Sequence, residues 1–125
     1  HIDFTFPFDN NLLSSFLNVS KLLKLKHYEN GVYASVQGPR LESAAEINRY
    51  ENDGANIVGM TGMPETALAR EIGLNYALIC PVANHAAGRG LNRDGVSHEE
   101  ISINSEKMAL NITKLIKGII ESYGN

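Results

Sequence analysis

The ten residues NIVGMTGMPE, Asn56 to Glu65, indicate how this chain folds. A short apolar run reaches Met60, and Thr61 and a glycine follow it before Pro64, a residue suited to the first turn of a helix. This succession of strand, loop and helix is typical of α/β folds, which bind ligands beyond the carboxyl ends of their strands. A thioether beside a hydroxyl at such a point raises the question of which ligand would contact both.

The rest of the chain continues the alternation of strands and helices. Three strands are predicted, at Gly31–Gly38, Asn56–Met60 and Tyr76–Ala83, the last being a continuous apolar run typical of a strand buried on both faces. Four helices are predicted, from Asn10 to about Lys26, from Ser43 to Asp53, from Pro64 to Gly73, and from Ser97 onward. Such elements form α/β layers, and the thin sheet indicates part of a larger domain.

Composition narrows the classes of protein to which the chain can belong. Its 125 residues suffice for one compact domain, and a net charge of −3 provides no basic surface for nucleic acid or an anionic membrane. No apolar stretch approaches transmembrane length, and no signal peptide is recognisable. Cys80 is the single cysteine, and cytoplasm is the expected location. The chain opens at His1 without an initiator methionine, so we expect a piece of a longer protein.

Polar residues that could contact a ligand follow the predicted strands. Glu42, in GPRLES, offers a carboxylate to a ligand N–H, although its place before Ser43 also suits a role at the helix N-cap. Asn84 follows the third strand, and its amide can donate and accept at the edge of a heterocycle, although asparagine there is also a common turn former. Because the carboxyl ends of the strands share one edge, we expect these motifs to converge.

For four further residues, the sequence alone gives one interpretation, two or none. Met60 can fill a gap in the core, and Thr61 can cap the next helix or contact an anion. His98 suits a solvated helix surface, and His1 has no interpretation from the residues alone. The chain lacks a GxGxxG motif opening a helix, a Walker loop, a GxSxG motif and metal-ligand spacing. The residues therefore indicate an α/β domain with a small polar-ligand crevice.

Three stretches, VQGPRLESAAEI, GANIVGMTGMPETALAREIGLNYA and VANHAAG, together resemble the trimeric purine nucleoside phosphorylase family. That family includes methylthioadenosine and methylthioinosine phosphorylases, and the resemblance is closest to the bacterial S-methyl-5'-thioinosine phosphorylase branch. It implies a three-layer phosphorylase/hydrolase-like α/β fold with a central twisted mixed sheet. Residues 1–125 would be the C-terminal half of that single domain. The N-terminal half, with its Gly-rich phosphate loop, Arg-His pair and further strands, would be absent.

The resemblance also implies an activity and residue roles. The reaction would be phosphorolysis of S-methyl-5'-thioinosine, inosine or guanosine to free base and a ribose 1-phosphate, in purine salvage. Phosphate would be a co-substrate, with neither metal nor organic cofactor. Glu42 would accept the purine N1–H, and Asn84 would read N7 and the 6-position, stabilising charge on the departing base. Asparagine in place of aspartate would favour hypoxanthine or guanine. Met60 would pack on the ribose, and Thr61 would lie near the phosphate.

The 5' substituent of the sugar stays open. His98 matches a histidine donor of relatives that prefer a 5'-hydroxyl, whereas His1 matches a histidine that methylthio-type enzymes donate from a neighbouring subunit. A homotrimer with sites at subunit interfaces is implied, and catalysis is expected to require the N-terminal half. Two alternatives remain: a nucleosidase that uses water, and a non-catalytic purine-binding half-domain.

Overall fold

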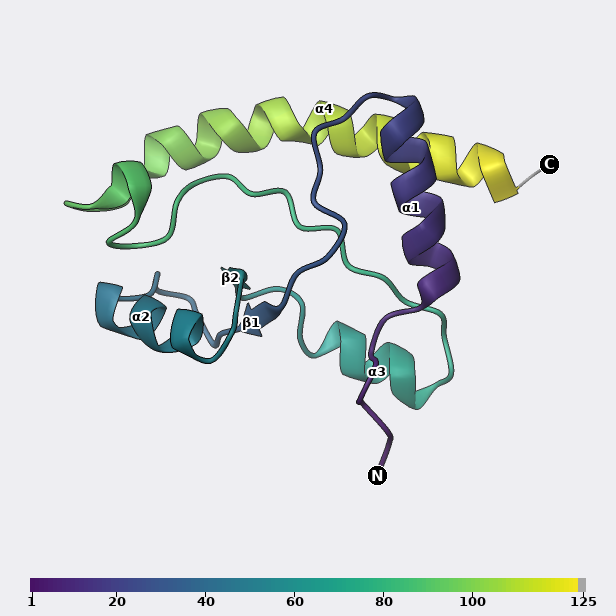
Figure 1. Ribbon diagram of the computed structural model, residues 1–125, viewed down its shortest axis with the longest axis horizontal. Coiled ribbons are helices and arrows are strands. Elements are labelled where there is room, and N and C mark those ends of the chain that lie inside the picture. Colours follow the sequence, from purple (N-terminus) through teal and green to yellow (C-terminus); the bar gives the residue numbers. More distant parts are fainter. Residues whose placement is uncertain (124–125) are drawn as a thin grey trace. The chain divides into compact units, whose positions relative to one another are not determined.

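The computed structural model describes residues 1–123, apart from the side chains of Glu100 and Tyr123 (Figure 1). The chain divides into two compact units, and each is described by itself. The first unit comprises residues 1–29, residues 61–80 and the stretch from Ala109 onward, and the second comprises residues 30–60 and 81–108. Both units join stretches that are far apart in sequence, so tertiary contacts hold each together.

The second unit is built on a β-α-β motif. β1 (Tyr33–Ser35) and β2 (Ile57–Gly59) pair in parallel, and Figure 1 shows them side by side. Parallel strands need a crossover connection, and α2 (Ala44–Asn52) supplies it. Ser43 and Glu46 form the predicted capping box, and Gly54 takes a left-handed φ of 91° just beyond the helix. The predictions for α2 and for both strands are thus confirmed in type and place.

The first unit packs helices around a small apolar cluster. It contains α1 (Asn10–Leu22), α3 (Glu65–Glu71) and the last part of α4 (His98–Tyr123), whose first part belongs to the second unit. The cluster consists of Val19, Leu115 and Ile119, with Phe16, Leu25 and Ile79 packed against it. Gly118 lets α4 approach α1 closely, since a Cβ added there would lie 2.7 Å from Val19 Cγ1.

Two helix boundaries differ from the prediction. α1 ends at Leu22 instead of near Lys26, because Lys24 takes a left-handed φ of 53° that no α-helix accommodates. Leu25 then packs against the apolar cluster instead of continuing the helix. α3 begins at Glu65, and Pro64 is its N-cap. A short 3₁₀ helix, η1 (Gly90–Asn92), lies in the loop before α4.

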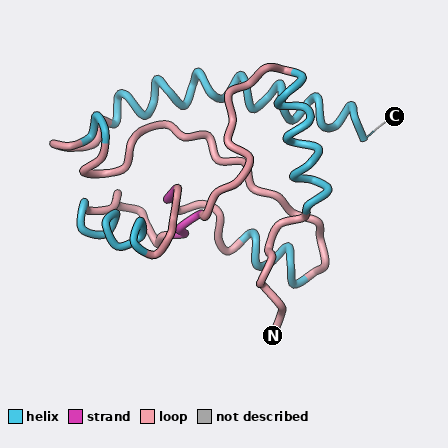
Figure 2. The backbone as a smooth tube through the Cα atoms, in the orientation of Figure 1, coloured by secondary structure: helices cyan, strands magenta, loops and turns pink. Residues whose placement is uncertain are grey.

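The predicted third strand, Tyr76–Ala83, is wrong for the described chain. The segment runs as a loop without strand pairing (Figure 2), and Val82 is 60% exposed. A strand exists only when a neighbour exchanges backbone hydrogen bonds with it, and no strand within residues 1–123 pairs with this segment. Within residues 1–123 the sheet therefore has two parallel strands instead of the three expected. An apolar run signals burial, but the neighbouring strand decides whether a ladder forms.

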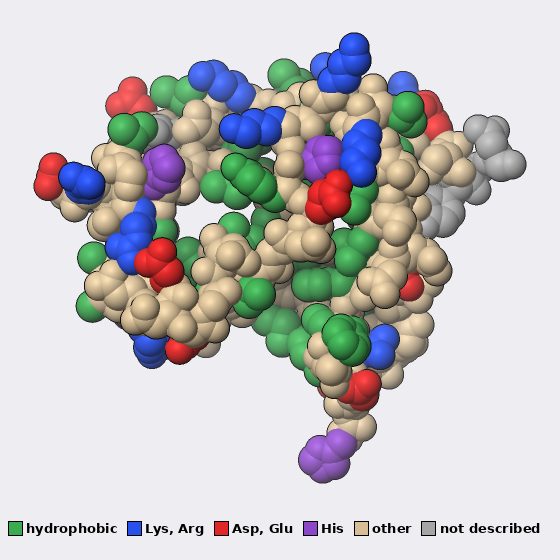
Figure 3. Space-filling model, viewed as in Figure 1, with side chains coloured by type: hydrophobic (Ala, Val, Ile, Leu, Met, Phe, Trp, Pro, Cys, Tyr) green, Lys and Arg blue, Asp and Glu red, His purple; other side chains and the backbone are tan. Residues whose placement is uncertain are grey.

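Large apolar side chains remain exposed in both units. Leu68, Ile72 and Leu74 follow one another along and after α3 with more than half of their surface accessible, and Leu91 of η1 is 81% exposed. Figure 3 shows hydrophobic side chains exposed on the visible face. The described helices include none that combines the length and apolarity needed to cross a bilayer.

Candidate functional site

The segments that follow β1 and β2 meet in the second unit, as the sequence predicted. Met60 comes directly after β2, and its Sδ would lie 2.7 Å from a Cβ added at Gly38, which follows β1. Gly38 also takes a left-handed φ of 61°. Only glycine therefore suits this position, because it accommodates both the close approach of Met60 and the left-handed backbone. The Val36 N–H donates to the Gly59 carbonyl at 3.0 Å and extends the strand pairing toward this point. The Met60 thioether is thus held against the loop that carries Glu42.

Glu42 lies on the N-terminal side of α2 and is half-buried. It is not the helix cap, because Ser43 and Glu46 fill that role. Arg40 donates to the two carboxylate oxygens of Glu46 at 2.9 and 2.8 Å. These bonds and those from Ser43 hold the pKa of Glu46 far below its ordinary range, while Glu46 and then Glu42 raise the pKa of Arg40. No donor within residues 1–123 hydrogen-bonds the Glu42 carboxylate.

Asn84 is half-buried, and hydrogen bonds to its side chain and to the preceding residue hold it in place. Its Nδ2 donates to the His85 carbonyl at 2.7 Å. The preceding carbonyl, that of Ala83, accepts from Nδ2 of Asn104 on α4 at 2.8 Å. These contacts orient the Asn84 amide with one N–H turned to its own loop. The second N–H and Oδ1 remain the groups that can read another molecule.

The other three predicted residues are exposed, and they fall in both units. His98 is the first residue of α4 in the second unit. His1 and Thr61 belong to the first unit, and Thr61 does not cap α3, since Pro64 occupies that position. Within the second unit, the structure thus brings Met60 against the loop of Glu42. Among the four in the second unit, no direct hydrogen bond or ion pair is described.

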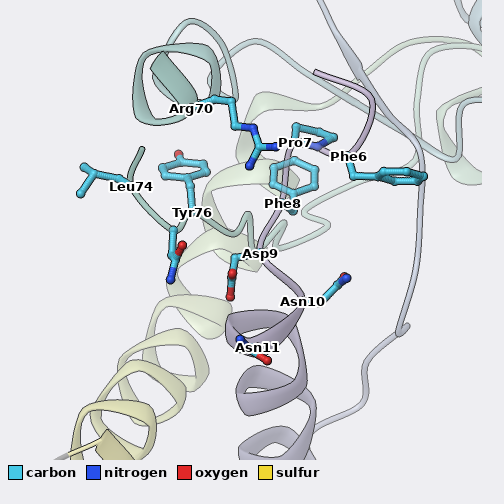
Figure 4. Close-up of a pocket in the computed structure, with 10 residues that line it drawn as sticks. Phe6, Pro7, Phe8, Asp9, Asn10, Asn11, Arg70, Leu74 and Tyr76 are labelled. Carbon is cyan, nitrogen blue, oxygen red and sulfur yellow. The ribbon is translucent and has the colours of Figure 1, made fainter. Parts of the chain in front are cut away.

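A hollow of about 420 Å³ lies in the first unit (Figure 4). It is lined by Phe6, Pro7, Phe8, Asp9, Asn10, Asn11, Arg70, Leu74, Asn75 and Tyr76. Figure 4 shows the Arg70 side chain extending toward Pro7 and Phe8, and its Nε donates to the Asp3 carbonyl at 3.3 Å. None of the six predicted site residues lines this hollow. In the described part of the chain, no three His, Cys, Asp or Glu side chains are placed to share a metal ion.

Comparison with protein families matches residues 1–121 to the family described as the phosphorylase superfamily. This chain belongs to the phosphorylase superfamily. The match covers both units, so it includes every residue that the sequence analysis singled out.

Curated relatives include nucleoside phosphorylases of two names. The "Probable S-methyl-5'-thioinosine phosphorylase" of Pseudomonas syringae pv. tomato is 51% identical over 89 residues, which are 71% of this chain and 36% of that protein. The protein of the same name from Xanthomonas campestris pv. campestris is 41% identical over 93% of this chain and 46% of its own length. The "6-oxopurine nucleoside phosphorylase" of Pyrococcus furiosus is 37% identical over 96% of this chain and 44% of its own length.

Solved structures agree on the fold. Methylthioadenosine phosphorylase from Schistosoma mansoni, in complex with adenine, matches with a TM-score of 0.91 at 21% identity. The match covers 99% of this chain and 49% of that one. The predicted α/β phosphorylase fold is therefore confirmed. The chain spans less than half the length of these members of the family.

Sequence reasoning missed the residues that shape the loop of Asn84. Arg89, Gly88 and Asn92 lie in the Gly-rich stretch after Asn84, which the sequence marks only as a turn-forming region. Their partners include Asn48 and Glu51 on α2, about 40 residues away in sequence. The glycines in this stretch predict a tight loop, but no local sequence pattern indicates that the loop packs against α2.

Proposed function

We propose that this chain forms the base-reading part of a purine nucleoside phosphorylase that acts on 6-oxopurine nucleosides. The observation that carries the proposal is that curated relatives of two different names share one substrate class. S-Methyl-5'-thioinosine carries hypoxanthine and is itself a 6-oxopurine nucleoside, so both names describe enzymes for this type of base. The products would be the free base and a ribose or methylthioribose 1-phosphate, as in purine salvage.

The purine would be held by Glu42 and Asn84. A 6-oxopurine carries an N–H at N1, and a carboxylate, which only accepts hydrogen bonds, suits that edge. Glu42 is a half-buried carboxylate that accepts no hydrogen bond in the described residues, which supports this role. The Asn84 amide retains one N–H for N7 of the purine.

The sugar and phosphate would be contacted by the segment after β2. Met60 would pack on the ribose, and its placement against Gly38 keeps the thioether at the end of the strand pair. Thr61, the next residue, would hold the phosphate through its hydroxyl. His98 and His1 are the candidates for the 5' end of the sugar, for a 5'-hydroxyl and a 5'-methylthio group respectively. The subunits would form a homotrimer, with His1 reaching a neighbouring site.

The chemistry follows from where charge develops. A phosphate oxygen forms a bond to C1' of the sugar while the C1'–N9 bond breaks, and the electron pair of that bond leaves with the purine. An N–H from Asn84 to N7 stabilises this negative charge, and Glu42 anchors the base during its departure. Bound phosphate beside the cation-like sugar supplies proximity and opposite charge. These residues use neither a metal nor an organic cofactor.

Turnover would require the rest of the family fold. This chain matches less than half the length of its relatives, and the resemblance assigns most phosphate contacts to the other half. We therefore expect the 125-residue chain to bind purine more readily than it catalyses. That the missing part is the N-terminal half stays a prediction.

The test is base release from inosine and from S-methyl-5'-thioinosine, each with and without phosphate. The chain is assayed alone and with a polypeptide carrying the part of the Xanthomonas campestris relative that it does not match. We expect phosphate-dependent release of hypoxanthine only from the mixture, and the rate ratio of the two substrates distinguishes His98 from His1. Release that is independent of phosphate would indicate a nucleosidase. Purine binding without release from the mixture would indicate a non-catalytic half-domain.

A further inference from the structure

The loop from Asn84 to Asn92 docks on one face of α2. Gly88 approaches the start of that helix so closely that a Cβ added to it would lie 2.9 Å from the Cβ of Ala44. One and two turns further along, Asn48 and Glu51 receive the side chain of Arg89. Positions 44, 48 and 51 recur at the spacing of a single helical face. The loop therefore lies along α2 and does not merely touch one point of it.

Arg89 is the polar anchor of this contact. Its Nη2 donates to Asn48 Oδ1 at 2.7 Å and to the carboxylate of Glu51, and its Nη1 donates to the Gly88 carbonyl at 3.4 Å. Only 34% of its side chain is exposed, although the Glu51 side chain is 63% exposed. A guanidinium holds its five N–H donors in a fixed planar arrangement, whereas an ammonium is a compact charge on a flexible stem. The side chain thus ties the loop both to the helix and to itself.

Asn92 closes the other end of the loop. It is 3% exposed, and its Nδ2 donates to the His85 carbonyl, the same oxygen that accepts from Asn84. Its backbone carbonyl accepts from Gly88 at 3.0 Å, and its N–H donates to Arg89 at 2.8 Å. The buried Asn92 therefore links the docked residues 88–89 to the carbonyl that orients Asn84.

We propose that Arg89 is a positioning residue, which holds the loop against α2 and thereby places the Asn84 amide relative to Glu42. Glu42 lies immediately before the N-cap of the same helix, so α2 connects the two groups. The proposal rests on the proposed function, in which Glu42 and Asn84 contact one purine. Arg89 itself touches no substrate in this scheme and acts through Asn84.

The test compares three variants of the 125-residue chain by two measurements. Arg89→Gln removes the charged guanidinium, and Arg89→Glu combined with Glu51→Arg restores an ion pair in reverse. Arg93→Gln alters an exposed arginine just after the loop and serves as a control. The first measurement is amide exchange by NMR in residues 84–92, including the Asn84 side chain. The second is the dissociation constant for hypoxanthine.

We expect Arg89→Gln to speed exchange in the loop and to weaken hypoxanthine binding by about fivefold, a modest effect because the ion pair is partly exposed. The reversed pair should recover both properties, and Arg93→Gln should change neither. Arg89→Lys, which keeps the charge without the planar guanidinium, replaces Arg89→Gln if that variant does not fold.

Two results would overturn the positioning role: exchange unaltered by Arg89→Gln, or faster exchange with unaltered hypoxanthine affinity. Failure of the proposed function gives a different result, because the unmodified chain would then not bind hypoxanthine at all. The exchange measurement still decides in that case whether Arg89 clamps the loop.

Discussion

In the proposed site, the Asn84 side-chain amide can both donate and accept hydrogen bonds to a ligand. It has two N–H groups and one acceptor oxygen, and the His85 carbonyl occupies one N–H at 2.7 Å. One donor and one acceptor therefore remain for a ligand. Aspartate has the same shape but no donor, so exchanging the two residues tests the amide without changing its size.

Asn84→Asp should weaken hypoxanthine binding about tenfold and raise affinity for adenine relative to hypoxanthine. The substitution removes the donor for N7 and places a carboxylate oxygen beside the His85 carbonyl, and leaving such a polar group unpaired costs about 1–3 kcal/mol. Calorimetric titration with both bases measures the ratio, and Asn75→Asp in the other unit serves as a matched control. An unchanged ratio would remove Asn84 from base recognition.

Substituting alanine at Gly38 and at Gly54 distinguishes the strain of a left-handed backbone from a steric contact with Met60. Both have left-handed φ values, 61° and 91°, so Gly→Ala should destabilise the fold at either position by about 1 kcal/mol. Only at Gly38 does the new Cβ meet Met60, whereas nothing lies within 4 Å of one at Gly54.

We therefore expect Gly38→Ala, but not Gly54→Ala, to shift the NMR signal of the Met60 methyl group and to weaken nucleoside binding. Urea unfolding of both variants establishes that the backbone costs are comparable. If both variants move the Met60 signal equally, the close contact between Gly38 and Met60 is not the cause.

Helix α2 has a complete capping box at its start. Ser43 and Glu46 exchange hydrogen bonds at the N-cap, and Arg40 binds the same carboxylate from the preceding loop. Replacing Ser43 with alanine should therefore destabilise the fold by about 1 kcal/mol. Because α2 also receives the Arg89 loop, fraying at its first turn would reach the Asn84 side of the site as well.

The cap also predicts a pH dependence. The Arg40 hydrogen bonds, and then those of Ser43, lower the pKa of Glu46 below its ordinary value of 4.5. A carboxyl whose pKa is lower in the folded state stabilises the fold above that ordinary value and loses this contribution as pH falls toward the folded value. The free energy of unfolding should thus exceed that of Glu46→Gln at pH 7, and the gap should narrow below about pH 4.5.

Urea unfolding of both proteins at a series of pH values measures this gap. Ser43→Ala, which removes one donor to Glu46, should move the narrowing to higher pH. A gap that is constant from pH 7 to pH 2 would show that the hydrogen bonds to Glu46 add no stability.

At the scale of the whole molecule, the main feature is the apolar stretch after α3, whose backbone groups lack strand partners within residues 1–123. Tyr76 receives a backbone hydrogen bond from Asp9, but Ala77 to Cys80 make none within residues 1–123. Members of the family are about twice as long as this chain. We expect strands from the additional length to pair with this half-buried segment, because backbone N–H and C=O groups need hydrogen-bond partners once they are buried.

The backbone amides of Ala77 to Cys80 should therefore exchange rapidly in this chain alone. Their exchange should slow at least tenfold when the polypeptide from the unmatched part of the Xanthomonas campestris relative binds, since ladder hydrogen bonds protect amides. Hydrogen exchange followed by mass spectrometry measures both states, with the amides of α1 as an internal reference. Strong protection in the isolated chain would contradict this interpretation.

The local features of the fold were predictable from the sequence because short-range interactions produce them. Ser43 and Glu46, which form the capping box, are three residues apart. Gly54 ends α2 because glycine readily adopts a left-handed φ. The apolar run of β2 gives way to a loop at Met60. The family could likewise be recognised from three continuous stretches, and the family match confirms it. The convergence of Gly38 and Met60 followed from the rule that parallel strands end at one edge.

Features that depend on distant partners were decided only in three dimensions. Tyr76–Ala83 has the composition of a buried strand, yet strand pairing needs a neighbour that residues 1–123 do not supply. α1 stops early because Lys24 turns so that Leu25 can reach the apolar cluster. The docking of Arg89 on Asn48 and Glu51 joins residues about 40 positions apart. In each case the deciding free energy comes from groups that lie close in space and far apart along the chain, so no local pattern of residues records it.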